Sequence, residues 1–379
     1  MASFPVLEQE TLFRNSTWTY RIPALLYLPR FSIILAFAEE REDAVDEHAK
    51  LIAMRRGSYN PTTQRVQWSS METLVSAQLK DHRSMNPCPV YDEVSGKLIL
   101  FFIAIPGKVS EHYQLRTKTN LVRLCHVTST DQGRTWSRAQ DITQDTISTE
   151  YQNWATFAIG PGHGLQLHYE ARSLLIPAYA YRILDPNKRP IPHAFCFISS
   201  DHGATWEVGR FVEKESAVEC QVAEVQVCGR EVLYCNARSS GGARIQAVSY
   251  NRGVDFEGGQ RVEALVEPPS GCHGSVVAFP PPPDARCQNS WLLYTHPTHR
   301  RVRRDLGIYL NTSPLNPALW TKPSILFKGF CAYSDLQYMG VGPDGSALFS
   351  CLFEYGTHRQ CEEIIFVMFT LKQAFPSEH

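Results

Sequence analysis

The stretch Ser129-Thr130-Asp131-Gln132-Gly133-Arg134-Thr135-Trp136 has the pattern S-x-D-x-G-x-T-W, and residues 199–206 (SSDHGATW) repeat it. A weaker copy, SYNRGVDF, occupies residues 249–256. The Asp or Asn positions are 131, 201 and 251, so the copies are 70 and 50 residues apart, with an average of 60. A repeat of this length divides the 379 residues into about six units and indicates propeller blades or a solenoid.

Each copy is suited to a tight turn. An Asp side chain can accept hydrogen bonds from nearby backbone amides, and Gly adopts a backbone conformation that other residues avoid. We expect the Trp ring to pack over the turn and into the blade. Asp131 and Asp201 are therefore interpreted as structural residues and not as catalytic acids.

Short apolar runs recur on both sides of these turns along the whole chain. They are rich in β-branched and aromatic residues and are bounded by Gly, Pro, Asp, Asn or Ser, as at residues 24–28, 97–105, 173–181 and 363–369. Helical periodicity is nearly absent, and the 24 Pro and 23 Gly are spread along the chain, which favours many turns over one linker. The sequence predicts an all-β fold with a single domain over residues 1–379.

Charge and hydrophobicity exclude several classes of protein. The 37 Lys and Arg almost balance the 38 Asp and Glu, so the chain lacks the basic excess that an electrostatic nucleic-acid binder needs. Hydrophobic residues make up 43% and charged residues 20%, which is typical of a globular protein. The longest apolar run, residues 98–105, is far shorter than the ~20 residues of a membrane-spanning helix. We therefore expect no stable membrane insertion.

The cysteines and histidines predict neither disulfides nor a metal site. The 11 Cys are odd in number, and no pair has the Cys-x-x-Cys spacing of a zinc or redox site. Several lie in apolar runs, where free Cys behaves as a small buried hydrophobe. The 13 His are scattered without a set of ligands around them. With no visible signal peptide, this pattern predicts a cytosolic protein.

A second motif connects the chain to a known family. Tyr20-Arg21-Ile22-Pro23 lies near the N-terminus, and together with the repeated turn, called the Asp box, it makes the chain similar to the sialidases. The resemblance extends over the full length. It implies a six-bladed β-propeller and an exo-α-sialidase that needs no cofactor. Such an enzyme would remove terminal sialic acid, with retention, from glycoproteins, oligosaccharides and gangliosides.

The resemblance implies three arginines that bind the substrate. Sialic acid carries a carboxylate on its anomeric carbon, and planar guanidinium groups bind carboxylates better than Lys does. Arg21 matches the first arginine and Arg238 the second. The third is Arg303 or its neighbour Arg304, and the register relative to Asp305 favours Arg303.

The same resemblance assigns the catalytic groups. An anionic nucleophile would be repelled by the substrate carboxylate, whereas a neutral Tyr would not, and sialidases use Tyr. Tyr333 matches this nucleophile, and Glu219 matches the base that takes its proton. Asp46 matches the acid/base that protonates the leaving oxygen and later activates water.

Other substrate-binding residues follow from the resemblance. Glu354 would orient Arg21, because a buried guanidinium without a carboxylate partner is costly. Tyr179 and Tyr181 alternate with Ala180, so both rings should face one side of a strand, and packing is the alternative role for the pair. Glu111 could equally be a loop charge. The remaining assignments are the subsite near O4 for Glu39 and Arg41, the N-acetyl pocket for Met85 and Asn86, and the glycerol tail for Glu111, Tyr179 and Tyr181.

Two other classes of function compete with hydrolysis. A propeller that binds sialic acid without turnover would keep the arginines and lose Tyr333, Glu219 or Asp46, yet all three are present. A scaffold for protein partners leaves the joint occurrence of these residues unexplained. The sequence therefore favours the enzyme, acting on sialylated glycoconjugates.

Overall fold

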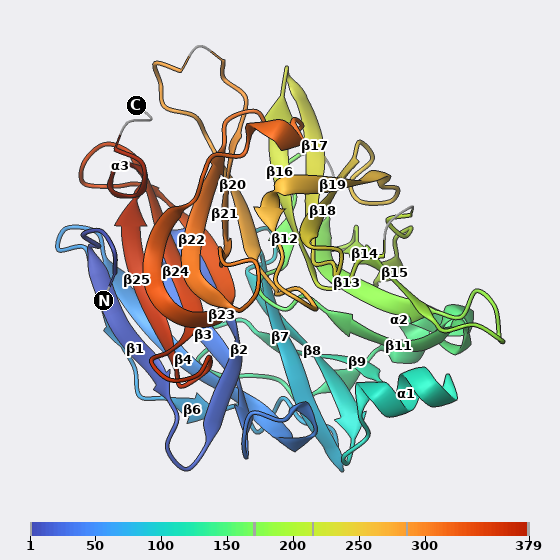
Figure 1. Cartoon of the computed structure of the whole chain (residues 1–379). Helices are drawn as coiled ribbons and strands as arrows, with labels where there is room; N and C mark the ends of the chain where they lie inside the picture. The colour runs from blue at the N-terminus through green and yellow to red at the C-terminus, as the bar shows by residue number, and fades with distance from the viewer. Residues whose placement is uncertain (1, 170–171, 214–215, 286, 377–379) are drawn as a thin grey trace.

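The computed structural model describes residues 2–169, 172–213, 216–285 and 287–376 (Figure 1). Within these ranges the strands form five antiparallel sheets. The first contains β2 (Thr19–Leu28), β3 (Ile33–Arg41), β4 (Ala49–Asn60), β5 (Arg65–Trp68) and β6 (Glu72–Thr73). The second contains β7 (His82–Asp92), β8 (Lys97–Pro106), β9 (Arg123–Ser129) and β10 (Gln140–Asp141). The third contains β11 (Trp154–Ile159), β12 (Leu165–Gln166), β13 (Leu174–Arg182), β14 (Ile191–Ser199) and β15 (Glu207–Val208).

The last two sheets complete the ring. The fourth contains β16 (Cys220–Val227), β17 (Arg230–Ala237), β18 (Ala243–Ser249) and β19 (Glu257–Val266). The fifth has seven strands, which are β20 (Ser275–Phe279), β21 (Trp291–Pro297), β22 (Arg304–Asn311), β23 (Ser324–Val341), β24 (Ala347–Gly356), β25 (Glu363–Thr370) and β1 (Glu8–Arg14). Because β1 pairs with β25, the two ends of the chain are fastened in one sheet (Figure 1).

Helices are short and lie between strands or at the C-terminal end. They are α1 (Glu111–Thr117), α2 (Thr143–Ile147) and α3 (Leu371–Ala374), with single 3-10 turns at Pro29–Phe31, Asp46–His48, Ser148–Asn153 and Pro317–Leu319. Over the described ranges, none of the helices has the length and apolar character needed to span a bilayer.

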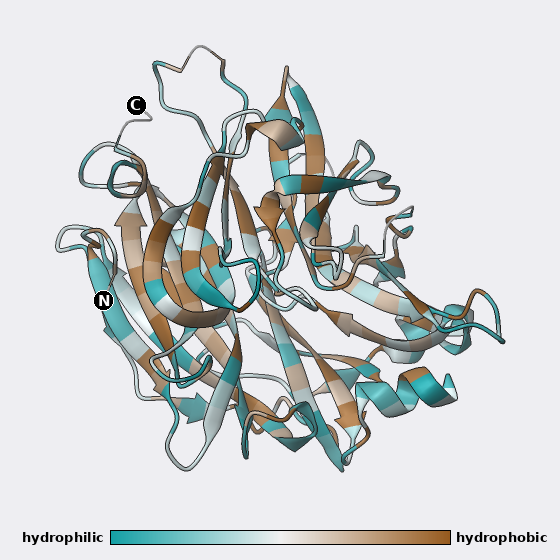
Figure 2. Cartoon of the chain, viewed as in Figure 1, coloured by the Kyte–Doolittle hydropathy of each residue, from teal (hydrophilic) through white to brown (hydrophobic). Residues whose placement is uncertain are grey.

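The sheets are arranged around a common centre as in a propeller. Strand β2 contacts β7, β7 contacts β11 and β13, β13 contacts β16, β16 contacts β20, and β23 contacts both β20 and β2. Apolar side chains fill the spaces between neighbouring sheets, and brown strand segments alternate with teal ends and loops in Figure 2. The all-β prediction is confirmed, and the arrangement is propeller-like.

The number of blades depends on how the seven-stranded sheet is divided. The first part of β23, up to Phe330, pairs with β22, and the part from Phe330 onward pairs with β24. A separate apolar cluster packs β20–β22 against β24 and β25 within this sheet. Division at β23 gives six units, whereas hydrogen-bonded sheets number five among the described residues. The six-blade count and the single domain over 1–379 therefore stay predictions.

The repeated motif forms the turn that its sequence predicts. In the first copy, Asp131 Oδ1 accepts hydrogen bonds from the Thr135 amide (2.9 Å) and the Ser129 hydroxyl (2.8 Å), and its Oδ2 accepts one from the Thr135 hydroxyl (2.6 Å). Asp201 makes the same three bonds with Thr205 and Ser199. These contacts confirm that the two Asp residues hold turns together.

The Trp residues of the motif pack over their own turns, as expected, and each also reaches the neighbouring sheet. The Trp136 ring lies edge-on to Phe37 of the first sheet at 6.2 Å, and the Trp206 ring lies edge-on to Phe101 of the second sheet at 4.7 Å. Each ring also lies over its own turn, because a Cβ on Gly133 would be 3.5 Å from Trp136 Cζ2 and one on Gly203 would be 3.6 Å from Trp206 Cζ2. A large flat ring at the end of a blade buries more apolar area in the gap between two sheets than over one turn.

Candidate active site

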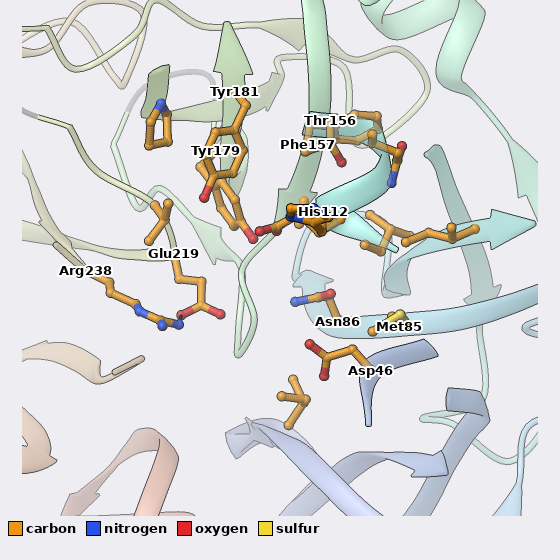
Figure 3. Close-up of a pocket in the computed structure, with 18 of the residues that line it drawn as sticks. Asp46, Met85, Asn86, His112, Thr156, Phe157, Tyr179, Tyr181, Glu219 and Arg238 are labelled. Carbon is orange, nitrogen blue, oxygen red and sulfur yellow. Dashed lines mark hydrogen bonds and ion pairs between the residues drawn. The ribbon is translucent and has the colours of Figure 1, made fainter. Parts of the chain in front are cut away.

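A pocket of about 590 Å³ opens where all five sheets meet, a size that suits a small-molecule ligand. All of the residues that the sequence assigned to catalysis or substrate binding line it, with the exception of Glu354. Figure 3 shows Asp46 on one side, Tyr179 and Tyr181 across from it, and Glu219 with Arg238 on a third side. The structure therefore brings together residues that are up to about 310 positions apart in the chain.

The centre of the pocket is a hydrogen-bonded group of three side chains. Tyr333 Oη donates to Glu219 Oε1 at 2.5 Å, and Arg238 Nη1 donates to both Glu219 Oε2 (2.7 Å) and Tyr333 Oη (2.8 Å). Glu219 directly precedes β16 and Arg238 directly follows β17, so strand pairing places the two opposite each other, with the Arg238 amide bonded to the Glu219 carbonyl at 2.8 Å. Tyr333 lies at a register shift in β23, and such irregularities redirect side chains.

The electrostatics of this group suit proton transfer from Tyr333 to Glu219. Burial raises the pKa of Glu219, but Arg238, His273 and the hydrogen bond from Tyr333 together outweigh it and the net pKa lies below the usual value, so the carboxyl is ionised. Burial and the Glu219 charge hold the pKa of Tyr333 well above its usual range. The resting state is therefore a neutral phenol that donates to a carboxylate, with a guanidinium beside both.

Three arginines surround the Tyr333 ring. The guanidinium carbons of Arg21 and Arg303 lie 5.5 and 5.6 Å from the ring centre, and Arg238 contacts the hydroxyl. Arg304 is exposed, stacks on Phe330 at 4.9 Å and does not line the pocket. The structure thus places Arg303, and not Arg304, beside the other two arginines.

Glu354 holds Arg21 and Tyr333 in place from behind the pocket. This fully buried carboxylate on β24 accepts hydrogen bonds from Arg21 Nε (3.1 Å), the Ile22 amide (2.9 Å) and the Tyr333 amide (3.1 Å). Arg21 also lies at a register shift of its strand, and Ile22 has a left-handed φ of 60°. The position predicted for Glu354, as the partner of Arg21, agrees with these contacts.

Asp46 begins a 3-10 turn in the connection between β3 and β4. Arg41 Nη1 donates to Asp46 Oδ1 at 2.6 Å, and the other side of Arg41 is held by the buried carboxylate of Glu39. The Asp46 side chain is 67% exposed and faces the pocket opening. Desolvation raises the pKa of Asp46, but Arg41 and then Arg21 outweigh it and lower the net value. Asp46 is therefore a solvent-accessible carboxylate of the site.

The remaining predicted residues form the far wall. Asn86 lies at a register shift of β7 with a left-handed φ of 55°, and its amide donates to Glu39 Oε1 at 2.7 Å, with Met85 beside it. The Tyr179 and Tyr181 rings are 6.1 Å apart on the same side of β13, as the alternation predicted. Glu111 is the first residue of α1 and also lines the pocket.

Sequence reasoning missed several residues at the pocket. His112, Arg83 and Arg189 line it, and Arg83 donates to the carbonyls of Gly107 and Val109 ahead of α1. His273 is fully buried with its ring 5.3 Å from that of Tyr333, and burial lowers the pKa of its imidazole to about 4. No motif marks these residues, because the fold alone brings them together from β7, from α1 and from connections between strands. Among the described residues, no group of three or more His, Cys, Asp or Glu is arranged to hold a metal ion.

The fold and the site define a class of protein, and the comparisons identify its family. A family model described as a BNR repeat-like domain matches residues 33–343. Sialidase-2 of Mus musculus is 59% identical, with 100% of this chain and 99% of that protein covered, and Sialidase-3 of Homo sapiens is 43% identical, with 94% and 90% covered. The chain therefore belongs to the sialidase family, and it is an enzyme of the exo-α-sialidase class.

Solved structures with the same fold are sialidases of microbial and parasite origin. The Hadza microbial sialidase Hz136 superposes with a TM-score of 0.74 at 24% identity and covers 93% of this chain and 66% of that chain. A Trypanosoma rangeli sialidase in complex with sialic acid superposes with a TM-score of 0.65 at 16% identity, with 97% of this chain and 58% of that chain covered. At these identities the likeness concerns the fold alone.

Proposed function

We propose that this enzyme removes terminal sialic acid from glycoproteins, oligosaccharides and gangliosides with retention of configuration, and that Tyr333 is its nucleophile. The observation that carries the proposal is the 2.5 Å hydrogen bond from Tyr333 to Glu219 inside a ring of three guanidinium groups. A phenol paired with an ionised base, in a pocket that favours an anionic sugar, fits a substrate with a carboxylate at its reacting carbon.

Binding begins with the substrate carboxylate. Arg21, Arg238 and Arg303 converge on the face of the Tyr333 ring and its hydroxyl, so a carboxylate bound among them lies next to the attacking oxygen. Charge-assisted hydrogen bonds to guanidinium groups fix both the position and the orientation of such a group. The remaining contacts would be made by Glu39 and Arg41 near O4, by Met85 and Asn86 at the N-acetyl group, and by Glu111, Tyr179 and Tyr181 at the glycerol tail.

In the first chemical step Tyr333 Oη forms a bond to the anomeric carbon while its proton passes to Glu219 Oε1. The bond from that carbon to the glycosidic oxygen breaks, and protonated Asp46 gives its proton to the leaving oxygen. Arg41 and Arg21 lower the pKa of Asp46 against the effect of desolvation in the free enzyme. A bound substrate carboxylate offsets the charge of Arg21, which raises the pKa of Asp46 again and favours the protonated form.

The second step reverses these roles. The Asp46 carboxylate takes a proton from a water molecule as the water oxygen attacks the anomeric carbon. The bond to Tyr333 breaks, and Glu219 returns its proton to the phenolic oxygen. Two inversions at the same carbon give net retention.

Activity itself tests the proposal. Purified protein should release a fluorescent aglycone from an α-sialoside, and a metal chelator should leave the rate unchanged, because each step uses only side chains of this chain. In proton NMR spectra recorded early in the reaction, the sialic acid that is released first should be the α-anomer. Absence of release from acid to neutral pH, with the fold intact and the ligand still bound, would instead support a non-catalytic sialic-acid-binding propeller.

Glu111 predicts how substrate binding depends on pH. Desolvation at the pocket, with repulsion from Glu219 and Asp46, raises the pKa of Glu111 to about 7. Below that pH the carboxyl is neutral, and above it the added negative charge repels the anionic substrate. KM should therefore rise between pH 6 and pH 8 by about fivefold, the size of one screened charge interaction.

Two variants separate this effect from other titrations. Glu111→Gln should remove the rise in KM and keep the low-pH value across the range. Glu42→Gln changes an exposed carboxylate outside the pocket and should keep the wild-type pH dependence. If the KM of Glu111→Gln still rises as in the wild type, another group causes the effect.

We also propose that the enzyme acts in the cytosol. All 11 Cys are free and nine of them are buried, which is consistent with a reducing compartment. Fractionation of cells that express the full chain would test this location, and recovery in the secretory or membrane fraction would contradict it.

A further inference from the structure

A buried ionic cluster lies behind the arginine side of the pocket. Arg244 Nη1 contacts Glu267 Oε1 at 2.9 Å, and His296 Nε2 contacts Glu267 Oε2 at 3.0 Å. Arg244 and His296 are fully buried, and Glu267 is 3% exposed. None of the three lines the pocket. A buried charge group needs a full set of partners, so its position in the fold is sharply defined.

Glu267 uses this cluster to fix two points of the backbone. Its Oε2 accepts a hydrogen bond from the Cys272 amide at 2.8 Å, and its Oε1 accepts one from the Ser239 amide at 3.2 Å. The Cys272 carbonyl in turn accepts bonds from Arg244 Nη1 (2.7 Å) and His296 Nε2 (3.2 Å). Ser239 is the residue after Arg238, and the loop of residues 268–272 is the part of the connection between β19 and β20 that leads up to and includes Cys272.

The carbonyls of that loop hold two of the three arginines. Ser270 O accepts hydrogen bonds from Arg238 Nε (3.0 Å) and Nη2 (2.7 Å), and Gly271 O accepts one from Arg303 Nη2 (2.9 Å). Ser270 and Gly271 have left-handed φ angles of 64° and 69°. A Cβ on Gly271 would lie 2.6 Å from Ser239 O and 2.8 Å from Arg238 Cγ. The loop is therefore packed tightly under Arg238.

We infer that Glu267 is a positioning residue for the carboxylate-binding arginines, because it fixes residues 268–272 and the backbone after Arg238. The inference rests on the proposed function, in which Arg238 and Arg303 bind the substrate carboxylate. Glu267 touches neither substrate nor the reacting atoms. The pKa of Glu267 is lowered to about 2, because Arg244 and His296 outweigh the effect of desolvation, so Glu267 stays ionised across the working pH range.

The test replaces Glu267 and measures binding separately from turnover. Glu267→Gln should raise the KM for an α-sialoside about tenfold, since hydrogen bonds to charged groups are weakened. It should also reduce the preference for free sialic acid over its uncharged methyl ester as an inhibitor, because the ester does not need the arginines. A merely destabilised protein would not change this preference.

Two further variants keep the inference falsifiable. His296→Gln removes one partner of the cluster and should raise KM about threefold. This variant provides the test if Glu267→Gln does not fold. Asp92→Asn changes another fully buried carboxylate, at the end of β7 six residues beyond Asn86, and should lower the melting temperature without changing KM or the ester preference. Wild-type KM and ester preference in folded Glu267→Gln and His296→Gln would overturn the inference. Absence of turnover in the wild type would instead overturn the proposed function.

Discussion

Tyr333→Phe should abolish most hydrolysis and preserve the binding of sialic acid. The substitution removes only the phenolic oxygen, so the ring still lies between Arg21 and Arg303, whose guanidinium carbons are 5.5 and 5.6 Å from its centre. Without the attacking oxygen, no covalent intermediate forms, and we expect kcat to fall by about 10³-fold or more. The dissociation constant for free sialic acid should change by a few-fold, because the two hydrogen bonds that are lost, to Glu219 and from Arg238, lie within the protein and the three arginines remain.

Stopped assays with a fluorescent α-sialoside and calorimetric titration with sialic acid measure the two quantities on the same protein. Tyr338→Phe is the matched control, since it makes the same change on the same strand, outside this pocket. It should retain wild-type kcat. Near wild-type turnover by Tyr333→Phe would show that another group attacks the anomeric carbon.

The turn motif was the part of the fold that sequence reasoning described best. Asp131 and its partners are local, so eight consecutive residues contain all of the information that the turn needs. The further contacts of Trp136 with Phe37 and of Trp206 with Phe101 could not be predicted, because they depend on which sheet comes next in space. Strand β23 is continuous, and its first section pairs with β22 whereas its second section pairs with β24. Nothing in its sequence marks where one propeller unit ends and the next begins.

The candidate site was predicted through family motifs, and the structure adds what those motifs leave out. The sequence left Arg303 and Arg304 as alternatives because they are adjacent, and only the pairing of Arg304 with Phe330 in the sheet shows which one faces outward. The left-handed conformation of Ile22, which redirects the chain at the pocket, cannot be seen in the sequence because a β-branched residue seldom adopts it. Asn86 is of a residue type that adopts it more often, but the residue type alone does not mark the position. Glu267 was missed because its partners Arg244, Cys272 and His296 come from β18, from the connection between β19 and β20, and from β21.

The three arginines should not be equivalent, and Arg238 should have the larger effect. Arg238 donates to Glu219 and to the Tyr333 hydroxyl, whereas Arg303 bonds to Gly271 O and only approaches the face of the ring. Both variants to Ala lose a charge-assisted contact to the substrate carboxylate, which should raise KM by about 10- to 100-fold. Only Arg238→Ala also disturbs the nucleophile and its base.

The second effect of Arg238→Ala has a definite direction in pH. Burial raises the pKa of Glu219, and Arg238 is the strongest of the groups that lower it again. Removal of Arg238 therefore raises the pKa of Glu219, so the base is protonated over more of the acid range and the acidic limb of kcat moves to higher pH. Arg303→Ala should raise KM and leave the acidic limb of the kcat profile at its wild-type pH. Arg304→Ala, which lies outside the pocket, should change neither KM nor the position of that limb. Equal pH profiles for Arg238→Ala and Arg303→Ala would mean that Arg238 acts on the substrate alone and that the Tyr333–Glu219 pair is tuned by other groups.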